Sequence, residues 1–487
     1  MIVTKLDNVN LQITSDNRGA LYDLHNYFTF EVPNYYFKRS SFSQWDGKIH
    51  LFNRKSQTLY VGLLSYLQDF ARQFEYDLEI DPALTNEEVD PIEVKKFIDA
   101  QDIRNKHEEV LDSRFYQSAG VYHIINRKRV TLVSPTASGK SLMLYLFSKW
   151  FLDNNKGKIM LIVPTTSLVL QMQGDFSDYS QTAIDDHVHI IYSGKEKESK
   201  TAKIYITTWQ SMQYLDKEYF DQFNAVIVDE CHGLAAKQLK RILENTQAEY
   251  RVGITGTLQD AQAHKWIIEG LLGPVVDLIS MKELMEKGWI AKLKIKCLVF
   301  EHRDKTKTQK LKKYFDEINY LVSNESRNNK ILQLMGHLKE NQFVLFDRIE
   351  HGKYLYEKAK ELYPERDIYL IYGINKAGER EEVRLALENK NNSIVIASYK
   401  IFSVGVSVNN LFHIIFAHPF KSKIRLFQSI GRSLRLHSEK DYATLWDIAD
   451  KFPGKKLNYT LKHFQERIMA YNQKELSYTI QTFELHN

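Results

Sequence analysis

The sequence has few of the residues that mark secreted, zinc-binding or membrane-spanning proteins. Among its 487 residues are only two cysteines, Cys231 and Cys297, which lie far apart and have no partners at metal-ligand spacing. A disulfide framework and a zinc cluster are therefore excluded. No run approaches the roughly 20 apolar residues that span a bilayer, and the first residues do not form a secretion signal. We expect a cytoplasmic protein without a membrane partner.

The sequence also lacks internal repeats and low-complexity tracts. Its 43% hydrophobic and 12% aromatic residues are typical of a chain that is folded along most of its length. Because a single core stops growing at about 250 to 300 residues, we expect about two to four domains. The net charge of +5 fits a polyanionic partner, but many soluble enzymes carry a similar charge.

Short apolar runs rich in β-branched residues alternate with longer amphipathic stretches. This pattern is typical of parallel strands that are buried on both faces and covered by helices. One series comprises residues 129–134, 158–164, 203–208, 225–230 and 251–256, and a second comprises 292–300, 342–347, 368–373, 393–398 and 413–417. The sequence therefore predicts an α/β protein with two doubly wound parallel-sheet lobes, in which ligands bind at the carboxyl ends of the strands.

An aromatic-rich segment with a hairpin-like pattern precedes the first lobe, and the acidic, turn-rich residues 81–90 separate the two. We predict a small α+β N-terminal DNA-binding domain and a short helical C-terminal extension around the two lobes. The predicted boundaries are 1–100 for the N-terminal domain, 101–290 for the first lobe, 291–455 for the second lobe and 456–487 for the extension.

The segment SPTASGKS, residues 134–141, follows a predicted strand and precedes a helical run. This order fits a phosphate-binding loop, in which Lys140 reaches the β- and γ-phosphate oxygens and the Ser141 hydroxyl holds Mg²⁺. Ser134 replaces the first glycine of the strict pattern, and ordinary turn chemistry explains such a loop on its own. The strand, loop and helix together favour a nucleotide site. Its predicted residues are Thr136, Ala137, Ser138, Gly139, Lys140 and Ser141.

Two adjacent carboxylates, Asp229 and Glu230, end a later strand of the same lobe. Asp229 can hold Mg²⁺, while Glu230 can orient and deprotonate the water that attacks the γ-phosphate. Acids at a strand end also cap the next helix. An acid pair in the same lobe as a phosphate loop favours the catalytic interpretation.

With Cys231 and His232, these acids resemble the DECH form of motif II in superfamily 2 helicases, and other signatures follow in that family's order. Arg114, Tyr116 and Gln117 resemble the Q motif, in which the glutamine pairs with adenine and the aromatic ring stacks on it. The segments PTTSLVLQM from Pro164 and TTWQS from Thr207 resemble motifs Ia and Ib, which grip a nucleic-acid backbone. Thr255, Gly256 and Thr257 resemble motif III, so Thr255 and Thr257 are the implied coupling residues.

The second lobe carries two further signatures of this superfamily. Residues 397–408 resemble motif V, although Val406 and Ser407 depart from its commoner ending after Gly405, the implied nucleotide contact. QSIGRSLR, residues 428–435, resembles motif VI. The likeness implies that Arg432 and Arg435 act as arginine fingers across the lobe cleft and that Gln428 helps to place the attacking water. A basic amphipathic helix is the alternative for this segment alone, but seven motifs in order exclude it.

Nearly the whole chain resembles the phage UvsW-type recombination and fork-remodelling helicases, including SQWDGKIHLFNR from Ser43. The resemblance implies two tandem RecA-like lobes, the cofactors ATP and Mg²⁺, and 3′ to 5′ movement. It also implies fork regression, Holliday junction branch migration and R-loop unwinding in recombination, repair and replication. The implied partners are branched, single-stranded and duplex DNA and RNA–DNA hybrids. We expect a monomer, in the host-cell cytoplasm if the chain is phage-encoded.

Aromatic and basic residues alternate from Tyr35 to Lys55. Aromatic rings can stack on bases while cations contact phosphates. A small sheet with an aromatic core explains the pattern equally well, and the family resemblance favours DNA contact. The predicted DNA contacts are Lys38, Arg39, Trp45, Lys48, Thr165, Thr208 and Ser398. An RNA helicase, a duplex-DNA translocase and a nucleotide-gated DNA-binding scaffold are the alternative functions.

Overall fold

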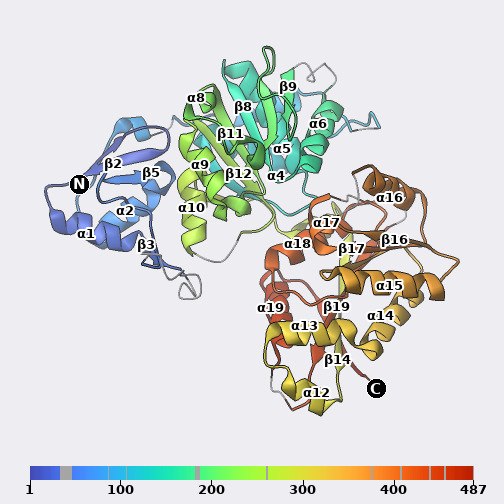
Figure 1. Ribbon diagram of the computed structural model, residues 1–487. Coiled ribbons are helices and arrows are strands. Elements are labelled where there is room, and N and C mark those ends of the chain that lie inside the picture. The colour runs from blue at the N-terminus through green and yellow to red at the C-terminus, as the bar shows by residue number, and fades with distance from the viewer. Residues whose placement is uncertain are drawn as a thin grey trace. The chain divides into compact units, whose positions relative to one another are not determined.

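The computed structural model describes the chain except for residues 33–45, 86, 106, 181–186, 259–261, 374–376, 406–407, 438–439, 455–456 and 486–487. Figure 1 shows three successive parts, an N-terminal domain and two larger lobes, each built on its own sheet. By packing, the chain divides into two compact units, Met1–Ser134 with Gly139–Leu278, and Pro135–Ser138 with Ile279–Asn487. The second unit begins at Ile279, ahead of the predicted boundary at residue 291. None of the described helices is long and apolar enough to cross a bilayer.

The N-terminal domain is α+β. Its elements are β1 (Ile2–Lys5), β2 (Asn10–Thr14), α1 (Arg18–Tyr27), β3 (Thr29–Glu31), β4 (Lys48–His50), β5 (Thr58–Tyr60), η2 (Val61–Leu63), α2 (Leu64–Gln73), β6 (Glu79–Ile80) and η3 (Pro82–Leu84). Over its described residues, a four-stranded sheet has the order β5-β2-β1-β6, and β3 pairs separately with β4. The inward residues of the sheet pack with Leu24 of α1 and Phe70 of α2 in one apolar core.

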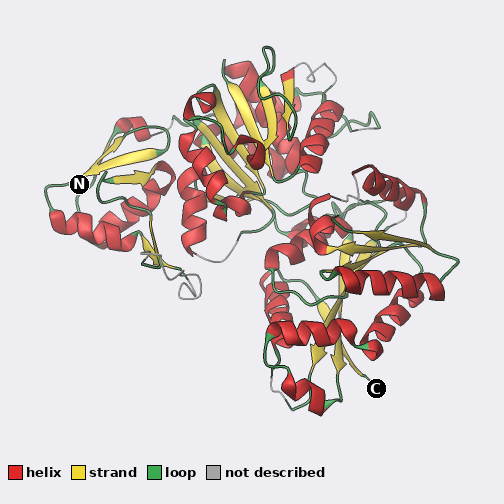
Figure 2. Cartoon of the chain, in the orientation of Figure 1, coloured by secondary structure: helices red, strands yellow, loops and turns green. Residues whose placement is uncertain are grey.

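The first lobe contains a parallel sheet covered by helices on both faces, as Figure 2 shows. Its strands are β7 (Arg129–Val133), β8 (Lys158–Val163), β9 (Val188–Ile191), β10 (Ile204–Thr208), β11 (Phe223–Asp229), β12 (Tyr250–Thr255) and β13 (Val275–Asp277). Among described residues, these seven strands have the order β13-β7-β12-β11-β8-β10-β9 and are all parallel. Ile159 and Leu161 enter one core and Met160 and Ile162 enter the other, because successive side chains of a strand point to opposite faces.

The helices of the first lobe include one that the predicted boundaries place elsewhere. They are α3 (Pro91–Asp99), α4 (Phe115–Arg127), α5 (Lys140–Asn154), α6 (Thr166–Tyr179), α7 (Trp209–Met212), α8 (Lys217–Phe220), η5 (Cys231–Ala235), α9 (Lys237–Asn245) and α10 (Gln262–Leu272). Val94 and Ile98 of α3 pack with Val121 and Ile124 of α4. Helix α3 therefore contributes to the first lobe, although the predicted N-terminal domain extends to residue 100.

The second lobe repeats the doubly wound arrangement. Its elements are α11 (Met281–Glu286), β14 (Lys292–Glu301), α12 (Lys305–Lys310), α13 (Tyr314–Ser323), α14 (Glu325–His337), β15 (Gln342–Phe346), α15 (Ile349–Leu362), β16 (Asp367–Ile371), α16 (Ala377–Asn389), β17 (Ser393–Ser398), α17 (Tyr399–Gly405), β18 (His413–Phe416), α18 (Lys423–Ser433), β19 (Tyr442–Lys451), α19 (Tyr459–Gln473) and β20 (Tyr478–Glu484). In the described part of the lobe, seven parallel strands have the order β16-β17-β15-β18-β19-β14-β20. The predicted fold class is confirmed.

Each of the predicted apolar runs corresponds to an observed strand. The strands that the sequence pattern did not predict in the two lobes, among the described residues, are β9, β13, β19 and β20. Strands β9, β13 and β20 lie at sheet edges, where burial on both faces is not required and the apolar pattern is weaker. Strand β19 is central, but the buried acids Asp447 and Asp450 interrupt its apolar run.

The C-terminal residues 456–487 contain the expected helix, but they also complete the second lobe. Arg467 of α19 donates to Asp447 Oδ1 at 2.7 Å and to the Phe420 carbonyl at 2.6 Å. The Tyr471 hydroxyl donates to the other oxygen of Asp447 at 2.8 Å. Strand β20 then pairs in parallel with β14. The segment is thus a structural part of the lobe and not a separate extension.

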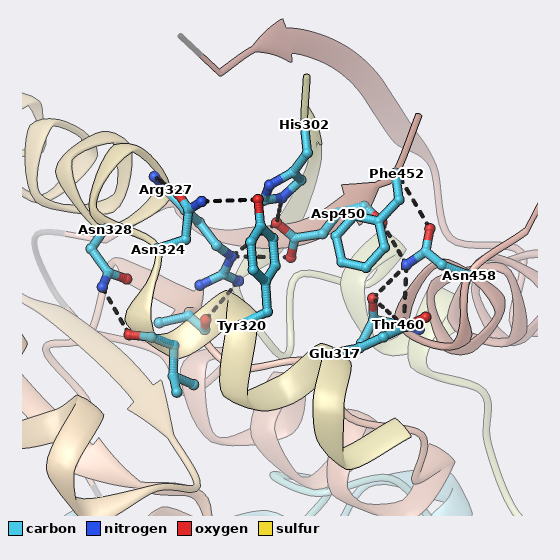
Figure 3. A network of polar contacts seen from close by, with 12 residues as sticks. His302, Glu317, Tyr320, Asn324, Arg327, Asn328, Asp450, Phe452, Asn458 and Thr460 are labelled. Atoms are coloured by element: carbon cyan, nitrogen blue, oxygen red, sulfur yellow. Dashed lines mark hydrogen bonds and ion pairs between the residues drawn. The ribbon is translucent and has the colours of Figure 1, made fainter. Parts of the chain in front are cut away.

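A buried network of hydrogen bonds and ion pairs connects helices of the second lobe to its sheet, as Figure 3 shows. Arg327 of α14 donates through Nε to Asp450 Oδ1 at 2.9 Å, and His302 Nε2 lies 2.9 Å from the same oxygen. Asn458, just before α19, donates to the Asp450 carbonyl at 3.1 Å and to the Thr460 hydroxyl at 2.8 Å. The side chains of Arg327 and Asp450 are completely buried. Each charge is therefore stabilised by the opposite charge of its partner and not by water.

We expect an Arg327→Met substitution to lower the free energy of unfolding of the second lobe by about 3 to 5 kcal/mol, because Asp450 would stay buried without its cation. Chemical denaturation followed by circular dichroism measures this loss. The control is Lys358→Met, which removes an exposed ion pair with Glu361 and should cost less than about 1 kcal/mol. Equal effects of the two substitutions would contradict the prediction.

Candidate active site

The loop between β7 and α5 has the geometry of a phosphate-binding turn. The Ser134 amide donates to the Thr255 carbonyl at 2.9 Å, which fixes the start of the loop to the end of β12. Ala137 and Gly139 both adopt left-handed backbone conformations, with φ of 68° and 76°. A Cβ atom on Gly139 would lie 2.4 Å from Gln117 Nε2. Gly139 is therefore required twice, by its backbone angle and by the side chain of Gln117 packed against it.

We expect a Gly139→Ala substitution to weaken ATP binding by about tenfold or more. A left-handed residue with a Cβ costs roughly 1 to 2 kcal/mol, and the methyl group would also displace Gln117. The matched control is Gly194→Ala, which has a similar φ of 84° but no atom within 4 Å of the added Cβ. Titration of a fluorescent ATP analogue measures both affinities, and equal affinities would contradict this prediction.

The carboxylates at the end of β11 lie beside the loop lysine. Lys140 Nζ is 3.9 Å from Glu230 Oε1. The Glu230 amide donates to Asp229 Oδ1 at 2.9 Å, and Glu230 itself adopts a left-handed conformation with φ of 50°. Such a conformation is uncommon for glutamate and occurs preferentially at functional sites. The structure thus brings Lys140, Asp229 and Glu230 together at the carboxyl ends of two strands of one sheet.

Thr255, at the end of β12, is the first residue of the predicted motif III and contacts Glu230. Its hydroxyl lies 3.1 Å from Glu230 Oε2, 2.9 Å from His232 Nδ1 and 3.0 Å from the Thr257 carbonyl. His232 Nδ1 is also 3.1 Å from Glu230 Oε2. Glu230 is therefore held by three groups, a lysine, a histidine and a threonine, which fix the orientation of its carboxylate.

The electrostatics of the two acids differ. Burial, together with the neighbouring charge of Glu230, raises the pKa of Asp229 to about 7. Burial also acts to raise the pKa of Glu230, but Lys140 and His232 outweigh it and lower that pKa to about 2. A cation beside Asp229 would relieve its unfavourable charge. Among the described residues, no group of three or more His, Cys, Asp or Glu side chains could hold a metal alone, so a Mg²⁺ ion would take ligands from phosphate and water as well.

Comparison with known proteins identifies the family. Residues 2–81 match the family model described as DNA helicase UvsW, N-terminal, and residues 103–260 match the one described as type III restriction enzyme, res subunit. The chain is 33% identical over 491 residues to the ATP-dependent DNA helicase uvsW of Enterobacteria phage T4, with 96% of each protein covered. The chain belongs to the UvsW family of helicases. It is an ATP-hydrolysing DNA helicase of superfamily 2.

A solved structure of the same T4 relative and one further relative are similar to this UvsW-family helicase. The crystal structure of T4 UvsW matches with a TM-score of 0.53 and 31% identity, covering 100% of this chain and 99% of that one. The DNA 3′-5′ translocase XPB2 of Sulfurisphaera tokodaii is 25% identical over 381 residues, which cover 70% of this chain and 82% of the relative. The predicted tandem RecA-like architecture is confirmed.

The Q motif of the UvsW-family helicase lies at the start of α4, beside the phosphate loop. Gln117 Oε1 accepts from the Arg114 amide at 2.8 Å, and its amide nitrogen faces Gly139. The Tyr116 side chain is completely buried, and its stacking on adenine stays a prediction. Phe115, the preceding residue, is 54% exposed and was not singled out from the sequence.

The predicted DNA contacts of the first lobe lie at the carboxyl ends of two adjacent strands. Thr165 is the N-cap residue of α6, after β8, and Thr208 ends β10, where it is in register with Val163. The Thr165 hydroxyl is buried and has no hydrogen-bond partner within the described part of the chain. Thr208 Oγ1 lies 3.0 Å from Ser211 Oγ. Their contact with a DNA backbone stays a prediction.

The remaining predicted residues have mixed outcomes. Lys38, Arg39 and Trp45 lie outside the described residues, as do Val406 and Ser407 of motif V. Lys48 lies in β4 and is exposed, Ser398 ends β17, and Gly405 ends α17. In the second unit, Gln428 and Arg432 lie on α18 and Arg435 follows it, all with partly exposed side chains. Their approach to the phosphate loop stays a prediction.

Proposed function

We propose that this helicase uses cycles of ATP binding and hydrolysis to remodel branched DNA, through fork regression, Holliday junction migration and R-loop unwinding. These activities would serve recombination, repair and replication. The observation that carries the proposal is the convergence of Lys140, Asp229 and Glu230 beside a phosphate loop in one lobe, with Lys140 Nζ 3.9 Å from Glu230. Membership of the UvsW family supports DNA as the nucleic acid.

The geometry of the first lobe suggests how its residues act. The turn from Thr136 to Gly139 and the N-terminus of α5 would cradle the triphosphate, with Lys140 moving from Glu230 toward the β- and γ-phosphates. Ser141 and Asp229 would hold Mg²⁺, which supplies charge neutralisation on the phosphoryl oxygens. Glu230 would orient the attacking water and accept its proton once Lys140 has moved to the phosphates. Arg432 and Arg435 of the second lobe would neutralise the transferring phosphoryl group, and Gln428 would help to place the water.

The proposed substrate class is tested by measuring ATPase stimulation and unwinding with single-stranded DNA, duplex, fork, Holliday junction, R-loop and RNA duplex at one stated salt concentration. The salt must be stated because phosphate contacts make affinity depend on it. We expect branched DNA to give the highest turnover and to be unwound. A preference for RNA duplex would overturn the proposal.

The direction of movement is proposed to be 3′ to 5′. The named activity of the archaeal relative, a DNA 3′-5′ translocase, supports this direction. Partial duplexes with a single-stranded tail of one polarity provide the measurement, and selective unwinding of the duplex with a 5′ tail would contradict it. We propose that the working form is a monomer, which light scattering during gel filtration can check.

Removal of divalent cations should abolish ATP hydrolysis. We expect addition of EDTA to reduce turnover to background and excess Mg²⁺ to restore it. Without Mg²⁺, Ser141 and Asp229 would have no cation to hold against the phosphates, and the phosphate charge would not be neutralised. The circular dichroism spectrum should not change, since the described residues contain no structural metal cluster. Hydrolysis at the full rate in EDTA would contradict the proposed role of Asp229.

Duplex translocation without strand separation is a second candidate, because residues 103–260 also match the restriction-enzyme family model. Displacement of a third strand from a triplex measures such movement directly. Triplex displacement without unwinding of any fork or junction would favour this second candidate.

A further inference from the structure

Helix α10 has two apolar faces that belong to different parts of the first unit. Ile268, Leu271 and Leu272 are buried in the core beneath the sheet of the first lobe. Trp266, by contrast, is a member of the core of the N-terminal domain. Ile268, Leu271 and Leu272 are spaced by three or four residues and so lie on one face of the helix, while Trp266 joins the other core. One helix is therefore shared by two cores. Helix α10 lies outside both matched family segments, 2–81 and 103–260, and begins just after the second.

The side chain of Trp266 is inserted among aromatic residues of the N-terminal domain. Its ring centroid lies 4.4 Å from that of Tyr66, 4.9 Å from Phe30, 5.2 Å from Phe28 and 5.7 Å from Tyr27. Apart from Trp266, the buried members of this core come from residues 3–70. The Trp266 ring is only 5% exposed and packs against four aromatic side chains of the N-terminal domain. Helix α10 is therefore an integral part of the core of that domain.

Polar and backbone contacts add to this attachment. The Tyr66 hydroxyl donates to Glu269 Oε2 at 2.8 Å, and Glu269 is almost completely buried. The backbone at Gly62 lies so close to α10 that an added Cβ would be 1.9 Å from the Glu269 carbonyl oxygen. The N-terminal domain therefore cannot shift along α10 without breaking several contacts at once.

On the side of α10 away from Trp266, His264 contacts the segment that follows Glu230, here called the His232 loop (residues 230–233). His264 Nε2 lies 3.0 Å from the carbonyl oxygen of His232. Burial lowers the pKa of His264. Because a carbonyl oxygen can only accept a hydrogen bond, the Nε2–H of His264 donates to it. His232 in turn is 3.1 Å from the catalytic carboxylate of Glu230. Three residues, His264, His232 and Glu230, thus join α10 to the acid that activates water.

We propose that α10 couples the ATP site to the N-terminal domain, with His264 as the positioning residue for the His232 loop and Trp266 as the anchor in the N-terminal domain. A change at Glu230 on nucleotide binding then moves the N-terminal domain together with α10. In the other direction, DNA held by that domain orients the His232 loop. This inference rests on the proposed function, in which the N-terminal domain contacts DNA. Nucleotide and DNA would each change the affinity of the other by the same factor.

The test measures that coupling factor with the full chain. The Kd for a forked DNA is determined with and without a non-hydrolysable ATP analogue, and the Kd for the analogue is determined with and without the DNA. Coupling of this type is commonly about 5- to 150-fold. We expect His264→Ala and Trp266→Leu to bring the factor close to 1, while the affinity for each ligand alone stays within about threefold of wild type. Tyr66→Phe, which removes only the hydroxyl bonded to Glu269, should lower the factor partially.

The matched control is His264→Gln, whose amide N–H can still donate to the His232 carbonyl and should preserve the coupling factor. A His264→Ala protein with wild-type coupling would overturn the role of α10, and so would equal loss in the alanine and glutamine variants. If Trp266→Leu unfolds the N-terminal domain, Tyr66→Phe replaces it in the test. A wild-type coupling factor in Tyr66→Phe would contradict the proposed attachment of α10 to the N-terminal domain. A wild-type ATPase that no DNA stimulates would instead refute the proposed function, so the two failures are distinguishable.

Discussion

A Lys140→Ala variant is expected to lose ATP hydrolysis by about two to three orders of magnitude and to lose unwinding completely, while it still binds DNA. The ammonium group is the positive charge that the first lobe places next to Glu230, at 3.9 Å, and the phosphate loop would have no side-chain cation to replace it. DNA binding should remain because the predicted DNA contacts lie on other loops. A coupled-enzyme ATPase assay and fluorescence anisotropy with a labelled fork measure the two properties.

The control for this variant is Lys149→Ala, which removes a partly exposed lysine from the same helix, α5, away from its N-terminus. Its turnover should equal that of wild type, which separates loss of the loop cation from a general effect of shortening a lysine on α5. Full ATPase activity in Lys140→Ala would contradict the proposal that this loop is the ATP site that drives unwinding. Loss of both ATPase and DNA binding would indicate that Lys140 stabilises the lobe and does not act on phosphate alone.

The convergence of Lys140, Asp229 and Glu230 could be predicted from the sequence because each part is local. Lys140 follows one strand and Asp229 and Glu230 follow another, and parallel strands of one sheet end at the same edge. Only the strand pattern and the residue types were needed to infer that these side chains meet. The left-handed backbone of Glu230 and its contact with Thr255 were not predictable, because they depend on how β11 and β12 pair.

The burial of Tyr116 was also not anticipated from its motif. A motif gives the residue type but not the side of the helix on which it lies. Tyr116, Gly120 and Ile124 are buried at intervals of four residues, so the periodicity of α4 already indicates that Tyr116 faces the core. Phe115 lies outside that stripe, and this spacing was the available signal for it.

His264 had no comparable signal. It contacts a backbone carbonyl of His232, and any residue type at position 232 offers the same carbonyl, so no pair of side chains marks the contact. The boundary residues of the N-terminal domain were likewise hidden, since α3 and Trp266 of α10 each join a core that lies in another part of the chain. Long-range packing of this kind is decided by tertiary structure and not by local pattern.

A Glu230→Gln variant is expected to bind ATP at least as tightly as wild type and to hydrolyse it about two to four orders of magnitude more slowly, the usual contribution of a general base. Glutamine keeps the size of the side chain and can still contact Thr255, but it cannot accept a proton from water. It also removes the negative charge beside Lys140, which frees the lysine for phosphate. The ATP-bound form should therefore accumulate.

Single-turnover hydrolysis and equilibrium binding of labelled ATP separate these two effects for Glu230→Gln, and slower dissociation of forked DNA in the presence of ATP should accompany them. Glu249→Gln is the control, because that glutamate forms an exposed ion pair with Lys128 away from the catalytic acids. It should leave both rates unchanged. If Glu230→Gln turned over ATP at the wild-type rate, another group would have to activate the water. Weaker ATP binding in this variant would show that the Glu230 carboxylate organises the nucleotide pocket instead of competing with phosphate for Lys140.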